Sequence, residues 1–366
     1  MVVKVGINGF GRIGRVIMRI LEERDTDIEV CAINLRNADI ERMAYQMEYD
    51  SVFGRFQGRV RATEDALVIN GKYIHVFSEE DPANIDWKSV GAEYIIESTG
   101  KFTKAEDCEK HFKGGAKKVI LSAPGKSDGF NTFVMGVNHQ TYDPSMRLIS
   151  NASCTTNCLA PLTKVINDKF GIEKALMSTI HASTSKQKPV DSNGGRDWRT
   201  GRSVFNNIIP SSTGAAKAVA QVIPEMKGKM TGMSFRVPTN DVSVVDLTAQ
   251  LKTSTTYEEI CDAVEEASQT YMKGIIEYNE DELVSGDIRG NYQTCVFDAK
   301  AGIMLDDSFV KLLAWYDNEW GYANQCINLV QYIARQDLKA VERAKKAASK
   351  KTAEKKAEKP AETKTK

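Results

Sequence analysis

The first part of the chain alternates short apolar runs with segments of helical spacing. Residues 2–8 form a β-rich run that ends in a glycine-rich turn at residues 9–14. Apolar residues then recur along one face of a helix, at Val16, Ile17, Ile20 and Leu21. A second apolar run follows at residues 28–34. The pattern predicts a strand, a helix and a strand in succession, which is the repeating unit of a parallel sheet.

Two more strand-like runs lie at residues 93–97 and 118–122, and each ends in a small polar or glycine-containing segment. Such ends lie at the carboxyl edge of a parallel sheet, where ligands bind. Further along, an apolar run at residues 146–149 leads through the polar segment 150–159 into residues 160–166, which have helical spacing. The layout is again strand, polar turn and helix.

The glycines of the first turn have the spacing Gly9-x-Gly11-x-x-Gly14, between the first predicted strand and the first predicted helix. In that setting the first glycine turns the chain, the second lets the backbone approach a pyrophosphate, and the third lets helix and strand pack. The pyrophosphate would then lie at the helix N-terminus. We therefore expect a dinucleotide-binding unit rather than a purely structural turn.

Length and composition favour two globular domains and no membrane span. The chain has 366 residues, of which 42% are hydrophobic, and no apolar run reaches the roughly eighteen residues that a bilayer requires. Residues 1–5 run straight into the glycine turn and do not resemble a signal peptide. Seven cysteines without scaffold spacing favour a reducing cytoplasm, and the four histidines do not cluster with them as metal ligands do. We expect a cytoplasmic protein without a metal site.

The formal charge of the chain is zero, but it is unevenly distributed. Residues 339–366 hold eleven Lys or Arg and four Glu, so this end carries +7 and the remainder −7. Residues 344–356 are of low complexity and have no core-forming side chains, so we expect a disordered or partly helical tail. We favour a solvated tail over one that contacts nucleic acid or another polyanion.

A cysteine stands where the helix after residues 150–153 is predicted to begin. Free backbone N–H groups and the positive end of the helix dipole favour the thiolate of Cys154, which is the reactive form of a thiol. An ordinary thiol is only slightly ionised near neutral pH, so such a nucleophile also needs a base. His181 directly follows a β-rich run and can accept that proton and return it. The alternatives are a small buried cysteine and a histidine that is hydrogen-bonded in a core.

Two further segments suit anions. Arg236 lies among apolar neighbours in the strand-like run 233–238, where its planar guanidinium suits a phosphate. Residues 208–217 offer hydroxyls and free N–H groups before a helix, and so predict a second phosphate cradle.

Five segments together resemble one enzyme family, the phosphorylating glyceraldehyde-3-phosphate dehydrogenases. They are SNASCTTNCLAPL at 150–162, the His181 segment, NIIPSSTGAAKAV at 207–219, SFRVPT at 234–239 and WYDNEWGY at 315–322. The resemblance runs from Val2 to about Ala334 and leaves out the tail after Leu338. It implies an enzyme of glycolysis and gluconeogenesis that converts glyceraldehyde 3-phosphate and inorganic phosphate to 1,3-bisphosphoglycerate.

The resemblance also implies a mechanism through a covalent intermediate. Cys154 would attack the aldehyde to give a thiohemiacetal, and His181 would act as base and then as acid. Hydride would pass to the nicotinamide, which leaves a thioester that inorganic phosphate attacks to release an acyl phosphate.

The same resemblance assigns binding residues around this pair. The substrate phosphate would be held by Thr184 and Arg236. The attacking phosphate would be held by Ser153, Thr155, Thr213 and Gly214. The dinucleotide would be lined by Gly9, Arg12, Ile13, Thr99 and Ser122, with Asn318 orienting the nicotinamide amide.

The implied fold is α/β with two domains, in a homotetramer. A Rossmann-type, doubly wound parallel-sheet domain would comprise residues 1–152 with 318–336, and an α+β catalytic domain with a mixed sheet would cover 153–317. Residues 339–366 would form the disordered Lys/Ala-rich tail. The segment 185–206 would contact the cofactor site of a neighbouring subunit, and an ordinary surface loop is the alternative.

The end of the second predicted strand departs from the usual dinucleotide pattern. An acidic residue there would bind the adenine ribose hydroxyls, but this chain has Leu35 and Arg36. Leu35 neither accepts a hydrogen bond nor repels a phosphate, and Arg36 can pair with one. Glu80 would repel that phosphate or hold Arg36 in a salt bridge. We expect NAD or NADP as the cofactor, with NADP accepted.

A second departure concerns the substrate side of the site. Lys186 lies two residues after Thr184, where the family usually has a small polar residue or aspartate. It adds positive charge near the expected position of the substrate phosphate.

Two other functions remain open from the sequence. An erythrose-4-phosphate dehydrogenase would use the same thioester with water as acceptor, but Thr155, Thr213 and Arg236 favour phosphate. A binding protein that kept the fold would use its basic tail on nucleic acid. The complete set of candidate catalytic residues argues against it: Cys154, His181, Arg236 and Asn318.

Overall fold

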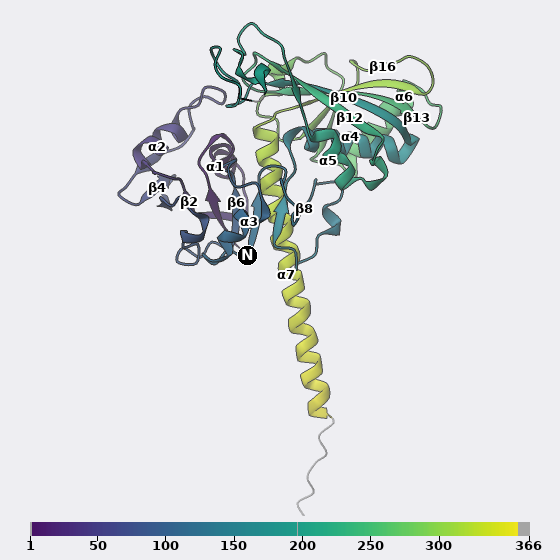
Figure 1. The fold of residues 1–366 in the computed structure, drawn as a ribbon. Helices are drawn as coiled ribbons and strands as arrows, with labels where there is room; N and C mark the ends of the chain where they lie inside the picture. The colour runs from purple at the N-terminus through teal and green to yellow at the C-terminus, as the bar shows by residue number, and fades with distance from the viewer. Residues whose placement is uncertain (1, 196, 358–366) are drawn as a thin grey trace, which may run out of the picture.

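Two sheets, each with its own hydrophobic core, make up the protein, and a long C-terminal helix runs between them and then away from the body (Figure 1). The computed structural model describes residues 2–195 and 197–357. The first sheet is mostly parallel and the second is mixed. The predicted α/β fold of two domains is therefore confirmed.

The first sheet has nine strands in the order β3-β4-β5-β2-β1-β6-β7-β9-β8. Neighbours from β5 to β8 pair in parallel, and β3 and β4 add an antiparallel edge. The strand order reverses between β1 and β6, and ligands of such sheets bind at that reversal. The strands are β1 (Val3–Asn8), β2 (Ile28–Asn34), β3 (Val60–Ala62), β4 (Ala66–Ile69), β5 (Lys72–Phe77), β6 (Tyr94–Glu97), β7 (Lys118–Leu121), β8 (Asn131–Thr132) and β9 (Leu148–Ser150).

Helices from both ends of the chain belong to this first unit. They are α1 (Arg12–Glu23), α2 (Ile40–Glu48), α3 (Ala105–Cys108) and α7 (Trp320–Ala357). The apolar face of α1 predicted from the sequence is buried, and Ile17 and Ile20 share one core with Ile327 and Val330 of α7. The C-terminal helix is thus part of the first hydrophobic core.

The register of the first sheet brings its functional turns to one edge. Asn8 pairs with Glu97, Glu97 with Leu121, and Leu121 with Ser150, so four strands end in the same row. The segments that follow these residues begin at Gly9, Ser98, Ser122 and Asn151. Each predicted turn at a strand end therefore lies at the carboxyl edge of the sheet.

The second sheet has the order β11-β12-β10-β13-β17-β15-β14, with β16 paired to β17. Its strands are β10 (Ile172–Ala182), β11 (Ile209–Ser212), β12 (Met230–Val237), β13 (Ser243–Leu251), β14 (Ile276–Asn279), β15 (Cys295–Asp298), β16 (Ile303–Met304) and β17 (Phe309–Tyr316). Its helices are α4 (Cys154–Phe170), α5 (Ala215–Val222) and α6 (Tyr257–Gln269). Residues of these three helices share the second core with the sheet.

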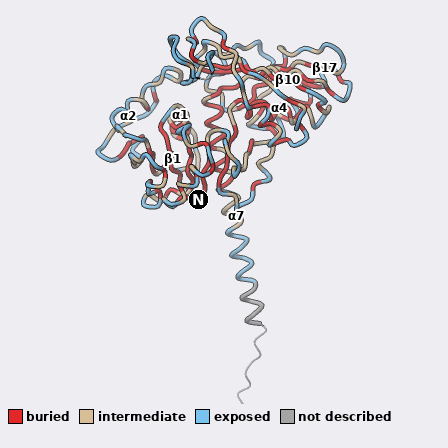
Figure 2. Tube along the Cα trace, in the orientation of Figure 1, coloured by how far each residue is buried: buried red, intermediate tan, exposed pale blue. Residues whose placement is uncertain are grey.

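The segment predicted as a disordered or partly helical tail continues α7 as far as Ala357. Alanine, lysine and glutamate are strong helix formers, which accounts for the extension. Residues 341–350 are all exposed, and Figure 2 shows the helix change from buried to exposed as it leaves the body. The remainder of the predicted tail, 358–366, lies outside the described residues.

Within residues 2–195 and 197–357, no helix has both the length and the apolar character needed to cross a membrane.

Removal of the tail should leave the fold intact. Because residues 341–350 are exposed, we expect a chain truncated after Leu338 to have the same thermal unfolding midpoint, within about 2 °C. Differential scanning calorimetry of both proteins measures this, and sedimentation velocity compares their assembly. A truncated chain that unfolds much earlier or changes its assembly would show that the extension packs on the protein.

Candidate active site

The predicted nucleophile lies at the junction of the two domains. Cys154 is the first residue of α4, and the Oγ of Ser153 caps this helix by accepting a hydrogen bond from the N–H of Thr156 at 3.1 Å. The turn before it includes Ala152, whose φ of 53° lies in the left-handed region. Few non-glycine residues adopt that conformation, and such strain clusters at functional sites. Tyr322 holds the turn by donating a hydrogen bond from its hydroxyl to the carbonyl of Ala152, at 2.9 Å.

His181 faces this thiol from the end of β10. Its Nε2 lies 3.6 Å from Cys154 Sγ, and its Nδ1 lies 2.8 Å from the carbonyl oxygen of Ala182. In the tautomer with its proton on Nδ1, the ring donates to that carbonyl and Nε2 is free to accept the thiol proton; in the other tautomer, Nδ1 accepts from Arg236. The structure therefore brings together the two residues predicted as nucleophile and base.

Arg236 is next to the histidine because β10 and β12 run in parallel, with His181 opposite Arg236. Its Nη1 donates to the carbonyl of Ala182 at 3.0 Å and lies 2.7 Å from His181 Nδ1. Its buried Nε has no hydrogen-bond partner within the described structure. A buried guanidinium N–H without an acceptor is costly, so this group suits an anionic ligand.

Burial favours the neutral forms of both residues, and Arg236 adds to this effect only at His181. Burial, and then the charge of Arg236, lower the pKa of His181 to about 3, so the imidazole is neutral at physiological pH. Burial raises the pKa of the Cys154 thiol, although Arg236, Thr155 and the N–H of Cys154 oppose the rise. The sequence predicted that the helix start would favour the thiolate. In the structure the cost of burial is the larger effect, so the thiol depends on the base.

The residues expected around an attacking phosphate are in different environments. Thr155 is buried, and its Oγ1 lies 2.8 Å from the hydroxyl of Tyr316 rather than facing solvent. Thr213 accepts a hydrogen bond from the N–H of Ala215 at 3.2 Å, and exposed Gly214 precedes α5 without a capping side chain. Because no side chain caps α5, its first N–H groups after that of Ala215 are left for an anion.

On the substrate side, Thr184 and Lys186 are both exposed. The N–H and the hydroxyl of Thr184 both donate to Gln187 Oε1, at 3.0 Å each. This places Thr184 in a tight turn two residues after the end of β10, close in sequence to His181.

The three glycines of the first turn have the geometry that a pyrophosphate needs. Gly9 has a φ of 100°, and a Cβ on it would lie 2.7 Å from the N–H nitrogen of Thr99. A Cβ on Gly14 would lie 2.3 Å from the carbonyl oxygen of Gly9, whereas one on Gly11 would meet nothing within 4 Å. The first glycine therefore makes the turn, the third allows close packing and the second faces open space. This structure fits a dinucleotide.

The other predicted cofactor residues surround this turn. Arg12 begins α1, and its guanidinium pairs with Asp50 and, at 2.6 Å, with Glu319. These carboxylates engage Nη1 and Nε, whereas the buried Nη2 has no hydrogen-bond partner within the described structure. The backbone N–H of Arg12 at the helix start also suits a phosphate. The hydroxyl of Ser122 donates to the carbonyl of Glu97 at 3.0 Å, and Ile13 packs partly buried on the first core. Asn318 accepts a hydrogen bond from Ser243 Oγ at 2.7 Å, which fixes its amide.

The predicted ribose-binding position holds a salt bridge. Leu35 follows β2 and is partly buried against the first core. Arg36 Nη1 lies 2.9 Å from Glu80 Oε1, with 60% and 58% of the two side chains exposed. Lys101 Nζ lies 3.6 Å from the same oxygen. Of the two roles predicted for Glu80, the structure has the salt bridge.

Sequence reasoning missed two tyrosines that support the site. Tyr316 places its hydroxyl 2.8 Å from Thr155 Oγ1 and 2.9 Å from Thr179 Oγ1, and its ring meets His181 edge-on. Tyr322 holds Ala152 as described above. Both belong to the segment WYDNEWGY, from which only Asn318 had been taken.

Comparison with known proteins points to one family along nearly the whole body of the chain. Residues 3–105 match the family model "Glyceraldehyde 3-phosphate dehydrogenase, NAD binding domain", and residues 153–318 match "Glyceraldehyde 3-phosphate dehydrogenase, C-terminal domain". A glyceraldehyde-3-phosphate dehydrogenase of Podospora anserina is 55% identical over 337 residues, which are 92% of this chain and 99% of the relative.

Two further relatives agree with it. A cytosolic glyceraldehyde-3-phosphate dehydrogenase of Chlamydomonas reinhardtii is 55% identical over 335 residues, 91% of this chain and 97% of the relative. One of Glossina morsitans morsitans is 57% identical over 334 residues, 91% of this chain and 99% of the relative. The matches cover 97–99% of each relative but only 91–92% of this chain, so this chain has residues outside the matched region.

Removal of the base should move the reactivity of the thiol to higher pH. In a His181→Asn variant no imidazole accepts the proton, and burial raises the pKa of Cys154, so the thiolate forms only under more alkaline conditions. The midpoint of the rate of alkylation of Cys154 by iodoacetamide against pH should therefore rise. Peptide mass spectrometry locates the label, and Cys31, which is also partly exposed, serves as the internal control. Equal midpoints in the two proteins would show that His181 does not accept the proton.

Proposed function

The chain belongs to the glyceraldehyde-3-phosphate dehydrogenase family, and we propose that its geometry carries out the phosphorylating oxidation of glyceraldehyde 3-phosphate to 1,3-bisphosphoglycerate. The observation that carries this proposal is the thiol of Cys154 at a helix start, 3.6 Å from His181 Nε2. A nucleophile beside a base at the edge of a dinucleotide-binding sheet is the arrangement that thioester chemistry needs.

In the first step, Cys154 Sγ attacks the aldehyde carbon and its proton passes to His181 Nε2. The carbonyl oxygen becomes an oxyanion, which the N–H of Cys154 at the helix start stabilises until the proton returns to it. The product is a thiohemiacetal on Cys154, and the imidazole is again neutral, as its low pKa requires.

In the second step His181 removes the hydroxyl proton of the thiohemiacetal, so that the carbon can release a hydride and become a thioester. A bound nicotinamide dinucleotide supplies the hydride acceptor. Inorganic phosphate then attacks the thioester, the acyl phosphate leaves, and the sulfur recovers a proton from His181. General acid–base catalysis of this kind contributes about 10²–10⁴ in rate.

Two groups of residues hold the phosphates in this proposal. Arg236 and Thr184 bind the phosphate of the substrate, supported by the unpartnered Nε of Arg236. Ser153, Thr155, Thr213 and Gly214 surround the attacking phosphate, supported by the free N–H groups at the start of α5. A bidentate guanidinium–phosphate pair fixes the orientation of the substrate as well as its affinity.

The dinucleotide is held at the edge of the first sheet. Gly9 and Gly11 let the backbone approach the pyrophosphate, and Arg12 and Ile13 contribute the first N–H groups of α1. Thr99 and Ser122 line the neighbouring strand ends, and Asn318 orients the nicotinamide amide. The fixed amide of Asn318 supports this role.

NAD is the cofactor named in the matching domain model, and we propose that NADP is accepted as well. Leu35 provides no carboxylate to repel a 2′-phosphate. For Arg36 to bind that phosphate it must leave Glu80, and an exposed ion pair is worth at most about 1 kcal/mol. A hydrogen bond between arginine and phosphate contributes about 1.5–3 kcal/mol. Lys101 remains near Glu80 and offsets its charge.

We further propose a cytoplasmic homotetramer. Large apolar side chains are exposed in the segment 185–206, including Val190, Trp198 and Phe205, and Trp198 is 85% exposed. Large apolar side chains that stay exposed within one segment suit a surface that another chain covers. A neighbouring subunit that covers this segment would place it beside that subunit's cofactor site. The location follows the relative of Chlamydomonas reinhardtii, which is named cytosolic.

Substitution of the nucleophile tests the mechanism. Cys154→Ser should abolish the oxidation of glyceraldehyde 3-phosphate while NAD binding persists, because a serine hydroxyl cannot form the thioester. Steady-state assays and titration calorimetry measure the two properties separately. Turnover above about a tenth of the wild-type value would contradict the thioester mechanism.

Turnover with both cofactors tests the proposal for NADP. We expect kcat/KM for NADP to lie within about a hundredfold of that for NAD, a difference of about 2.7 kcal/mol or less. Arg36→Ala should lower the NADP value alone. Lys117→Ala is the matched control, because this lysine is also in an exposed ion pair, with Glu93, but precedes β7 at the opposite edge of the sheet. An equal loss for both cofactors in Arg36→Ala would mean that Arg36 does not bind the phosphate.

A further inference from the structure

Glu97 is a buried acidic residue that no lysine or arginine neutralises. It ends β6, its side chain is 0% exposed, and among the described residues no lysine or arginine is within ion-pair distance of it. Burying a carboxylate costs far more than burying a neutral side chain unless hydrogen bonds satisfy it. The hydrogen bonds of Glu97 therefore show what the carboxylate is there to hold.

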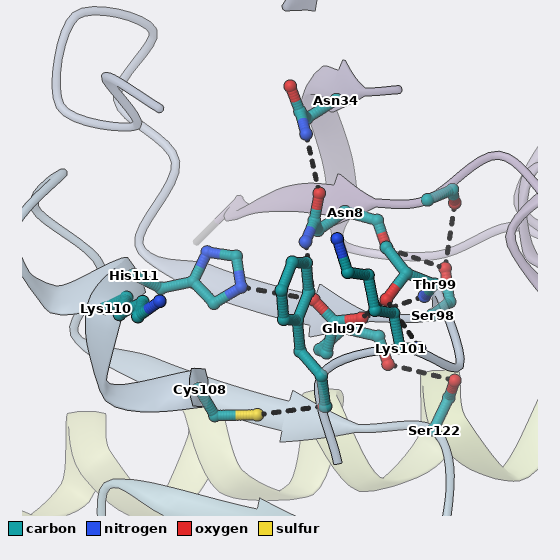
Figure 3. A network of polar contacts seen from close by, with 12 residues as sticks. Asn8, Asn34, Glu97, Ser98, Thr99, Lys101, Cys108, Lys110, His111 and Ser122 are labelled. Carbon is teal, nitrogen blue, oxygen red and sulfur yellow. Dashed lines mark hydrogen bonds and ion pairs between the residues drawn. The ribbon is translucent and has the colours of Figure 1, made fainter. Parts of the chain in front are cut away.

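Four donors converge on the two carboxylate oxygens (Figure 3). Oε1 accepts from the backbone N–H of Thr99 at 2.8 Å and from the Thr99 hydroxyl. Oε2 accepts from Asn8 Nδ2 at 2.5 Å and from His111 Nε2 at 3.2 Å. Four acceptor positions are what an ionised carboxylate has, so Glu97 is fully satisfied and accepts only.

His111 approaches Glu97 as a neutral donor. The indole N–H of Trp87 donates to His111 Nδ1 at 3.1 Å, so Nδ1 carries no proton. The proton of the neutral ring is then on Nε2, which faces Glu97. The residue lies in the short 3₁₀ segment Glu109–Phe112 and is fully buried, so this arrangement is shielded from solvent.

The carboxylate of Glu97 fixes the orientation of two side-chain amides in succession, those of Asn8 and Asn34. Because the carboxylate only accepts, Asn8 must present its NH₂ to Glu97 and its Oδ1 to Asn34, which donates to it from Nδ2 at 2.7 Å. Asn34 also donates from Nδ2 to the carbonyl of Glu79 at 3.0 Å and accepts the N–H of Glu79 at 2.9 Å. Each of these hydrogen bonds has one permitted donor. If Glu97 became a donor, Asn8 and then Asn34 would have to turn their amides, and Asn34 would lose its hydrogen bonds to the backbone of Glu79.

This series of hydrogen bonds crosses the part of the sheet edge where the dinucleotide is proposed to bind. Glu97, Asn8 and Asn34 are the last residues of β6, β1 and β2. Asn8 directly precedes Gly9, and Asn34 directly precedes Leu35. Glu97 accepts the N–H of Thr99. Asn34 binds the backbone of Glu79, next to Glu80, which pairs with Arg36. One buried carboxylate thus connects the pyrophosphate end of the site to its adenosine end.

We infer that Glu97 is a positioning residue for the adenosine-diphosphate half of the dinucleotide, and that His111 supports it as a donor. This inference rests on the proposed NAD site. Glu97→Gln would replace an acceptor by an amide donor facing the donors of Thr99 or Asn8. Asn8 or the Thr99 backbone would have to turn away, and the strand ends would lose the arrangement that receives the ligand.

Direct binding to the purified protein, without substrate, tests the inference. Glu97→Gln should raise the Kd for NAD and for ADP-ribose by the same factor, at least about tenfold. The alkylation rate of Cys154 in the absence of ligand should stay within about twofold of wild type. Glu93→Gln is the matched control, since Glu93 immediately precedes β6 but lies in an exposed ion pair with Lys117.

A Kd for NAD within about twofold of wild type in Glu97→Gln, at whatever unfolding temperature, would overturn the inference. A weaker affinity for NAD with unchanged affinity for ADP-ribose would also overturn it. So would a fall in the alkylation rate of Cys154 by the same factor as the fall in affinity for NAD. If instead the wild-type protein fails to oxidise glyceraldehyde 3-phosphate, the proposed reaction fails while these binding comparisons still decide the role of Glu97.

Two variants of His111 give an independent test should Glu97→Gln fold poorly. The glutamine side chain carries an NH₂ group and a carbonyl, so His111→Gln keeps a donor for Glu97 and an acceptor for Trp87. His111→Phe keeps neither. We expect His111→Gln to bind NAD like wild type and His111→Phe to bind several-fold more weakly. Equal affinity in the two variants would overturn the role of His111 as the donor to Glu97.

Discussion

The catalytic arrangement depends on one sharp turn between β9 and α4. The strand ends at Ser150 and the helix begins at Cys154, so the chain must pass from strand to helix within three residues. It does so through Ala152 in the left-handed region, a conformation that costs of order 1–3 kcal/mol. Hydrogen bonds offset this cost: Asn157 donates to the carbonyl of Asn151 at 2.7 Å, and Tyr322 donates to that of Ala152. The thiol can reach both the base and the cofactor edge because this turn is held.

Much of this site could be predicted from the sequence because it is encoded locally. Glycine spacing between a strand and a helix specifies the dinucleotide turn, and the order of apolar run, polar segment and helical spacing around Cys154 predicts the helix start. The parallel register that sets His181 beside Arg236 is not local, since the two residues come from strands far apart in the chain. The sequence could suggest each residue separately but not their 2.7 Å approach or its effect on the pKa of the imidazole.

The other contacts that the sequence did not predict also join residues that are far apart in the chain. The ion pairs of Arg12 with Asp50 and Glu319 join residues from three distant segments. The contact of Thr155 with Tyr316 also depends on tertiary packing, and Glu97 gave no signal in the sequence beyond ending an apolar run. The tail differed for another reason. Its composition excludes a core but not a helix, and its strong helix formers extend α7 to Ala357.

The position of α7 in the first hydrophobic core has a consequence for the order in which the protein is made. The sheet that binds the dinucleotide is complete at β9, yet Cys326, Ile327 and Val330 of α7 fill the same core. A ribosome adds about 5–20 residues per second, so the nascent sheet waits on the order of ten seconds or more for this helix. During that time the second sheet is synthesised with its own helices and can bury its core. The domain that begins the chain is therefore the last to be completed, and its apolar face stays open to chaperones until synthesis is nearly finished.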